Sequence, residues 1–149
     1  MGRRYCVPGS CTTAAGSKTA SILSATTVRP AIYDIIIGAA AAPGDQAVNW
    51  GVLRAASSLG TGTAFTPNPL DAGDPASLVT AAITHSSEPT YTANSNLFQA
   101  SINQRTTFRW VAFPGSELKS VVTASSGIGL RAISSTGTQV QETCVWFEE

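Results

Sequence analysis

The chain has 149 residues, and nine basic side chains balance nine acidic ones, so its formal net charge at pH 7 is zero. The length suits one domain, and a neutral chain with only 12% charged residues lacks the strong field that attracts nucleic acid, anionic lipid or polyanionic substrates. Small residues dominate, because 22 alanines, 13 glycines, 17 serines and 18 threonines fill almost half of the positions. This composition excludes a coiled coil, a charged disordered tail and a disulfide-rich miniprotein.

The first 17 residues are small, polar and without periodicity. We therefore expect them to form an extended N-terminal arm that contacts a neighbouring molecule, and we expect the domain to stay folded without it. The charged start Met1–Arg4 is not followed by the apolar segment of an export signal, and no apolar stretch is long enough to cross a membrane. Synthesis in a cytoplasm follows as an expectation.

Three cysteines, Cys6, Cys11 and Cys144, cannot all pair within one chain, and no histidine lies near them in the sequence to complete a zinc site. Cys6 and Cys11 share a short segment in which a bridge could close. Free thiols are the favoured interpretation, and the bridge is the alternative.

From residue 18 onward, short segments rich in β-branched and aromatic residues alternate with turn residues, which is typical of an all-β domain. We expect a single jelly-roll-like antiparallel β-sandwich over residues 18–149. The nine expected strands are Thr19–Ala25, Ala31–Gly38, Ala47–Ala55, Thr63–Thr66, Asn96–Ile102, Thr106–Phe113, Lys119–Ala124, Gly129–Ser134 and Thr138–Phe147. The nearly continuous apolar run Ile32–Ile37 predicts a central strand, in which the carboxylate of Asp34 needs solvent or a hydrogen-bonding partner.

One segment predicts a short helix. In Asp71–Ile83, Asp74 is a suitable N-cap and Pro75 suits the first helical position, while Leu78 and Ala82 share one face. The surrounding excursion from Gly60 to Ala93 contains four prolines, and long excursions of this kind often contact partners.

No local motif predicts catalysis, a cofactor or a metal. The segment Gly9–Thr19 has the wrong glycine spacing for a phosphate-binding loop. His85, the only histidine, is interpreted as a polar loop residue, because the adjacent Ser86 and Ser87 would point away from it. Helix capping accounts for Asp71 and Asp74 without a metal ion. We therefore do not expect an enzyme.

Aromatic and arginine side chains are the candidates for contacts with other molecules. Trp50, Trp110 and Trp146 lie in alternating strand patterns, which favour burial in the core or at a subunit interface over an exposed sugar-binding platform. Seven arginines against two lysines favour interfacial ion pairs. The candidate interface residues are Arg3, Arg4, Tyr5, Trp50, Arg54, Tyr91, Arg105 and Arg109.

Several stretches resemble small structural proteins of tailed bacteriophages. They are Asn49–Trp50, Pro69–Asp71, Glu88–Ala93, Asn103–Gly115, Gly127–Leu130 and Phe147–Glu149, within a similarity that covers about residues 30–149. The resemblance implies a virion component with a β-sandwich fold, such as a capsid decoration or cement protein, and it brings no catalytic residue.

The expected function is accordingly to bind and stabilise the lattice of the major capsid protein on the capsid surface, as a homotrimer matching local three-fold positions. Two alternatives remain: a carbohydrate-binding or receptor-adhesion module, in which a tryptophan or tyrosine such as Tyr91 would lie exposed beside polar groups, and a neck or tail component. Because the chain has few charges, we expect its attachment to particles to be largely indifferent to salt.

Overall fold

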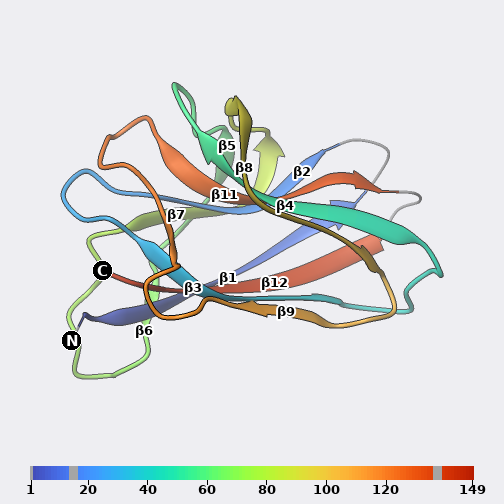
Figure 1. Ribbon diagram of the computed structural model, residues 1–149, viewed down its shortest axis with the longest axis horizontal. Coiled ribbons are helices and arrows are strands. Elements are labelled where there is room, and N and C mark those ends of the chain that lie inside the picture. The colour runs from blue at the N-terminus through green and yellow to red at the C-terminus, as the bar shows by residue number, and fades with distance from the viewer. Residues whose placement is uncertain (1, 14–16, 136–138) are drawn as a thin grey trace.

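The computed structural model describes residues 2–13, 17–135 and 139–149. Every regular element in this part of the chain is a β-strand, and the strands form two antiparallel six-stranded sheets that pack face to face (Figure 1). The expected β-sandwich is thereby confirmed. None of the described residues belongs to a helix that could cross a membrane.

The two sheets are named here sheet I and sheet II. Sheet I runs from β9 (Phe108–Val111) and β10 (Leu118–Lys119), which both pair with β3, through β3 (Ala31–Ala39), β12 (Gln139–Glu148) and β1 (Arg4–Thr13) to β6 (Asn68–Pro69). Sheet II runs in the order β5 (Thr61–Phe65), β7 (Thr80–Ser87), β2 (Lys18–Ser24), β11 (Gly127–Ser135), β4 (Ala47–Ala55) and β8 (Tyr91–Asn103).

The topology is that of a jelly roll, in which one long antiparallel hairpin is rolled into two sheets. Strands of the first half pair with strands of the second half in reverse order: β1 with β12, β2 with β11, β3 with β9 and β4 with β8. Rolling adds the pairs β3–β12 and β4–β11. The segment β5–β7 is an insertion between β4 and β8, at the tip of the hairpin.

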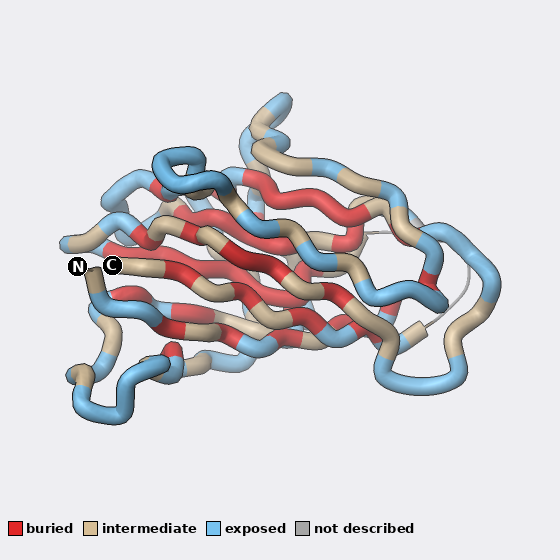
Figure 2. The backbone as a smooth tube through the Cα atoms, turned by 60° about the horizontal axis from the view of Figure 1, so that its bottom comes forward, coloured by how far each residue is buried: buried red, intermediate tan, exposed pale blue. Residues whose placement is uncertain are grey.

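The core lies between the sheets and follows the two-residue period of the strands (Figure 2). In β1 and β12, Tyr5 and Phe147 point inward and stack with ring centroids 5.6 Å apart. Trp50 of β4 is fully buried and belongs to the same apolar cluster. Each large side chain removed from water in this way stabilises the fold by about 1.5–3 kcal/mol.

The N-terminal segment is not an arm, which corrects the sequence-based expectation. Residues 4–13 form β1, which lies inside sheet I and pairs with β12 over ten residue pairs, from Arg4–Glu148 to Thr13–Gln139. The small polar residues of this segment do not indicate a strand in the sequence. In the structure, however, buried and exposed residues alternate along it, and Tyr5 and Val7 are completely buried. Met1 and residues 14–16 lie outside the described part of the chain.

The helix expected over residues 71–83 is absent. Asp71 instead closes a turn, accepting hydrogen bonds from the backbone N–H groups of Gly73 and Asp74. The backbone N–H groups of Leu78 and Val79 donate to the carboxylate of Glu149, and residues 80–83 pair with β2 as part of β7. An isolated helix of this length is marginal in water, so tertiary hydrogen bonds decide its conformation.

The other expected strands differ mainly at their ends. The expected strand Ala47–Ala55 is β4 with the same bounds, whereas β8 begins five residues before the expected strand that starts at Asn96. The expected strand Lys119–Ala124 is mostly a loop after β10. Thr138, the expected start of the last strand, lies outside the described residues.

Candidate interaction surface

Exposed apolar side chains gather at the end of the sandwich where the two chain termini meet. We call this part the terminal end; the termini lie beside each other at the left of Figure 1. Seven large hydrophobic side chains are exposed among the described residues, and six of them belong to the terminal end: Leu70, Leu78, Val111, Phe113, Val121 and Val122. The seventh is Val140. An uneven distribution of this kind marks a contact surface.

Hydrogen bonds hold several of these exposed residues, or their neighbours in the chain, at the ends of strands. Leu70 N–H donates to Arg4 O at 2.9 Å, and Leu78 N–H donates to the carboxylate of the last residue, Glu149. Ser120, which precedes the two exposed valines, donates its N–H to Pro30 O and accepts a hydrogen bond from Arg29 Nε at 3.2 Å. The surface is therefore built on strand ends.

Phe113 is the most exposed of these side chains, with 83% of its surface accessible. It begins the turn Phe113–Ser116, closed by a hydrogen bond from Ser116 N–H to Phe113 O at 2.9 Å. Pro114 and Gly115 occupy its centre, and Gly115 has a φ of +86°, which suits a type II turn. The proline fixes the turn, so the aromatic ring is presented to solvent from a stiff backbone.

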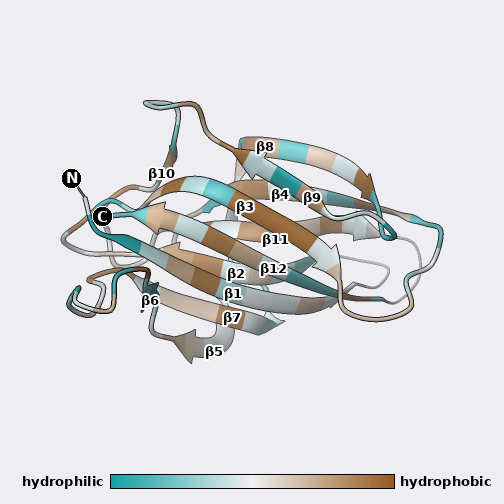
Figure 3. Ribbon diagram, turned by 90° about the horizontal axis from the view of Figure 1, so that it is seen from below, coloured by the Kyte–Doolittle hydropathy of each residue, from teal (hydrophilic) through white to brown (hydrophobic). Residues whose placement is uncertain are grey.

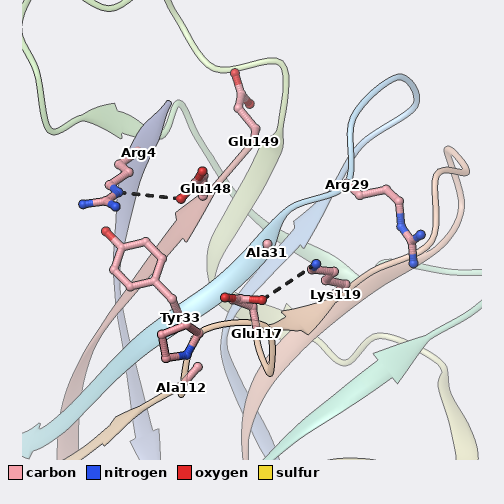
Figure 4. A pocket seen from close by; sticks show the side chains of 10 residues that line it. Arg4, Arg29, Ala31, Tyr33, Ala112, Glu117, Lys119, Glu148 and Glu149 are labelled. Carbon is pink, nitrogen blue, oxygen red and sulfur yellow. Dashed lines mark ion pairs between the residues drawn. The ribbon is translucent and has the colours of Figure 1, made fainter. Parts of the chain in front are cut away.

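A cavity of about 630 Å³ lies beside this turn and opens to solvent (Figure 4). Its lining includes Tyr33 of β3, Ala112 and Pro114 after β9, and Arg4 and Glu148 on the terminal strands. The guanidinium of Arg4 lies 5.7 Å from the centre of the Tyr33 ring. Partial burial raises the pKa of Tyr33 above its ordinary value, so the hydroxyl stays protonated near neutral pH.

Charges at this cavity are mostly paired with each other. Arg4 Nε lies 3.7 Å from Glu148 Oε2, and Lys119 Nζ lies 3.7 Å from Glu117 Oε2. Arg29 is exposed, and the hydrogen bond of its Nε goes to a backbone carbonyl. A partner at the terminal end would meet apolar side chains and two ion pairs, with the Arg29 guanidinium available for a carboxylate.

The outer face of sheet I continues from the terminal end and carries a half-buried tryptophan. Trp146 of β12 lies between Cys6 of β1 and Asp34 of β3 in the register of the sheet. Asp34 meets its need for a partner through Arg109 of β9, whose Nε donates to Asp34 Oδ1 at 3.0 Å while Nη2 donates to Oδ2. Trp146 is therefore neither in the core nor fully exposed.

A second group of polar residues lies on sheet II. Glu88 accepts hydrogen bonds from the N–H and hydroxyl of Thr19, at 2.9 and 2.8 Å, and pairs with Arg131 at 3.2 Å. Tyr91 hydrogen-bonds to Thr19 Oγ1 and packs under the Arg131 guanidinium at 4.8 Å. Burial is the main cause that raises the pKa of Tyr91. These contacts fasten the chain after β7 onto the sheet.

His85 is not the polar loop residue that the sequence predicts. It lies in β7 with only 7% of its surface exposed, and its two ring nitrogens have no hydrogen-bond partner within the described structure. Burial lowers its pKa, opposed by the nearby Glu88 carboxylate. Ser86 and Glu88 make other contacts, so the geometry does not assemble a nucleophile with a base.

The candidate interface residues fall into separate groups. Arg3 and Arg4 lie at the terminal end, and Arg109 lies on the outer face of sheet I. Arg105 pairs with Asp45 at 3.8 Å in the turn between β8 and β9. Arg54 is exposed on β4. The structure thus brings Arg3 and Arg4 to the surface described above and leaves Arg54 and Arg105 away from it.

Tyr5 and Trp50 are not interface residues, because both side chains are fully buried inside the single chain. This corrects the expectation for both residues. The alternation of apolar and polar residues along their strands places them in the core of the sandwich and not at an interface. Tyr91 is half-buried in the Glu88 group rather than exposed beside polar residues.

All three cysteines are free, as the favoured interpretation has it. Cys6 is half-buried on the outer face of β1, whereas Cys11 is buried on its inner face. Side chains on opposite faces of one strand cannot be bridged, which excludes the Cys6–Cys11 alternative. Burial raises the pKa of the Cys11 thiol to about 12.

Sequence reasoning missed most of the exposed apolar residues of the terminal end. Leu78 was assigned to the buried face of a helix that does not form, and the two valines at positions 121 and 122 to a strand that is a loop. The Phe-Pro-Gly-Ser turn was the available signal, because proline followed by glycine predicts a type II turn that would leave Phe113 outside the strand.

The described residues contain no group of three or more histidine, cysteine, aspartate or glutamate side chains placed to hold a metal ion. No family model, curated protein or solved structure matches the chain.

Proposed function

We propose that this protein is a virion structural protein of a tailed bacteriophage: a capsid decoration or cement protein that binds the major capsid protein lattice through its terminal end. The observation that carries the proposal is the concentration of six of the seven exposed large hydrophobic side chains on that end. The sequence resemblance supplies the class of particle, and the homotrimeric assembly belongs to the same proposal.

Physical properties of the terminal end support attachment to a protein lattice. Phe113 stands on a stiff turn, so little conformational entropy is lost when it enters a pocket of a partner. Four of the adjoining charges form two ion pairs, Arg4–Glu148 and Lys119–Glu117, so an apolar contact does not bury these charges unpaired. Many weak contacts of this kind add up on a repetitive shell when several chains are joined in one body.

The test is binding of the purified protein to particles assembled without it from the major capsid protein of the same genome. Occupancy is measured by sedimentation followed by gel densitometry. The double variant Phe113→Ser/Leu78→Ser should reduce occupancy at least tenfold, and wild-type occupancy should change little between low salt and about 1 M salt.

The matched control is Val140→Ser, which removes the seventh exposed hydrophobic side chain without touching the terminal end. Equal binding of the double variant and the control variant would contradict the proposal, as would release of the wild-type protein by salt alone.

A carbohydrate-binding or receptor-adhesion function is the second candidate, and Trp146 favours it. Its ring lies half-exposed next to the Asp34–Arg109 ion pair on the outer face of sheet I, a combination of apolar surface and polar groups that suits a sugar. Quenching or a shift of tryptophan emission by added glycans, abolished in Trp146→Leu, would support this function over shell binding. Imaging of the labelled protein on the particle distinguishes a neck or tail location from a location on the capsid.

A further inference from the structure

One long side of the sandwich, between β8 and β9, is open. Within the described residues, strand β8 ends sheet II and pairs only with β4, while β9 pairs only with β3 at the edge of sheet I. The two strands follow each other through a turn and run along the same side of the molecule, at the upper edge of Figure 3. Backbone N–H and C=O groups along both edges therefore lack strand partners.

The opposite side of the sandwich, by contrast, is covered by the chain itself. There the insertion crosses from β5 in sheet II to β6 in sheet I and back to β7. Val79, which lies in this crossing, is 2% exposed, and the hydroxyl of Tyr5 donates to Pro75 O at 3.0 Å. The chain thus covers one side of its core with its own insertion and leaves the other side without cover.

Aromatic side chains fill the open side. We call this group, Leu97, Phe98, Ile102, Phe108 and Trp110, the side cluster. The Phe98 ring lies 5.7 Å from Phe108 and 5.9 Å from Trp110, centre to centre, so the cluster joins the two sheets. All five side chains are only partly buried although they pack against the core. Partly exposed aromatic residues between unpaired strands are characteristic anchors of subunit interfaces.

The second half of the β8 edge also lacks the features that prevent pairing between chains. Natural edge strands are short, charged or interrupted by proline. In this protein β5, β6, β9 and β10 are at most five residues long, whereas β8 has 13 residues. No charged residue and no proline occurs from Tyr91 to Gln104. Irregular register limits regular pairing with β4 to its second half, from Phe98 to Asn103.

We propose that this open side joins copies of the chain, with the side cluster at the centre of the interface and the β8 edge beside it. The uncharged strand β8 of a chain with zero net charge meets its own copy without repulsion, and the backbone N–H and C=O groups without strand partners along this side can hydrogen-bond to those of the other copy. Self-association into a homotrimer is part of the proposed function, and this inference names the surface through which the copies would meet. It is argued from the contacts of β8 and β9 and does not involve the terminal end.

The available area agrees with a specific contact. The seven residues 97–103 of β8, from Leu97 of the side cluster to the end of the strand, span about 24 Å, and two sheets about 10 Å apart present a side roughly 20 Å wide including the strands themselves. Each copy would bury on the order of 500 Å², or about 1,000 Å² in total, which is the lower limit for a specific interface.

Sedimentation of the isolated full-length protein tests the inference without any particle. We expect the wild type to have the mass of two or three chains at about 100 μM and to dissociate on dilution. The variant Gln99→Lys/Ser101→Lys places two exposed charges on the β8 edge of every copy, and we expect it to raise the dissociation constant at least tenfold.

Thr61→Lys/Thr63→Lys is the matched control, since it adds the same charges at exposed positions of β5, the other edge of sheet II, and should leave the mass unchanged. Thermal unfolding verifies that both variants fold. Hydrogen exchange gives a second measurement, because amides of residues 97–103 should exchange more slowly in the assembled wild type than in the dissociated variant.

A wild type that stays monomeric at about 100 μM would overturn the inference, and so would an oligomer that both lysine variants preserve. Failure here leaves the particle-binding result of the Phe113→Ser/Leu78→Ser variant unaffected, so the two proposals fail separately.

Discussion

The ion pair between Asp34 and Arg109 allows a carboxylate to lie within the buried strand β3. Asp34 interrupts the isoleucine run of β3, and only 6% of its surface is exposed. A carboxylate in such a position is tolerated when both oxygens accept charge-assisted hydrogen bonds. Arg109 supplies them from the neighbouring β9 and keeps most of its own side chain in solvent.

Replacing Arg109 by methionine should lower stability, because it leaves the Asp34 carboxylate buried without its partner. The urea midpoint of Arg109→Met should therefore fall below that of the wild type, and Asp34→Asn should recover part of the loss when combined with it. A double-mutant cycle measured by urea unfolding checks this coupling. If the effects of the two substitutions on the free energy of unfolding were additive, the interaction between Asp34 and Arg109 would contribute nothing to stability.

His85 should make the protein sensitive to mild acid. Burial lowers its pKa below the ordinary value of 6.5, so the unfolded chain takes up a proton first as the pH falls. The histidine thus favours the folded state above pH 6.5, and this advantage is lost as the pH falls toward the lower pKa of the folded state. His85→Leu should show a smaller decrease of the free energy of unfolding between pH 7 and pH 5, measured by urea titration at each pH.

At the scale of elements, β1 is the part of the fold that the sequence concealed. Ten residues with one tyrosine and one valine look like a tail, because strand formation there depends on a partner 126 to 144 positions away. The register with β12 supplies backbone hydrogen bonds, and Tyr5 and Val7 reach the core. Local composition does not contain that information.

Removing residues 2–13 should prevent folding, in contrast to the behaviour of a free arm. The deletion exposes the inner edge of β12 and removes Tyr5 from its stack with Phe147. We expect loss of cooperative thermal unfolding and of dispersed amide resonances in the truncated chain. A truncated protein that unfolds cooperatively near the wild-type temperature would contradict the assignment of β1 to the core.

Strands with strong local patterns were predictable from the sequence, and elements held by distant contacts were not. Ala47–Ala55 alternates clearly and is β4 with the same bounds, and the isoleucine run is the central strand β3. β7 was mistaken for part of a helix, because the Glu149 carboxylate that binds the preceding backbone lies 70 residues away. For the same reason the sequence predicts only part of the candidate surface. Arg4 is among the predicted interface residues and belongs to this surface, whereas the positions of the exposed apolar residues depend on how distant loops fold back.

At the scale of the whole molecule, the rolled hairpin places both chain ends in one sheet. Arg3 and Glu149 exchange two backbone hydrogen bonds, with N to O distances of 3.3 and 3.0 Å. The terminal end therefore combines the first residues, the last residues and the loops that carry Phe113 and Leu78. A change at either terminus acts directly on the surface that we propose for shell binding.

A circular permutant should fold, because the native ends are adjacent. Joining them by a short glycine-serine linker and opening the chain between Ala124 and Ser125, which are both exposed, retains every strand. We expect cooperative unfolding and a free energy of unfolding within about 2 kcal/mol of the wild type, measured in urea. A permutant that aggregates or unfolds without cooperativity would show that the order of the strands along the chain, and not only their packing, is required.

The β1–β12 pairing also has a consequence for biogenesis. β1 leaves the ribosome before β12, and its longest run of partners forms only after β12 has been translated. Until then its apolar residues remain available to chaperones or to other nascent chains. Each new copy can therefore close sheet I only after β12 has emerged from the ribosome.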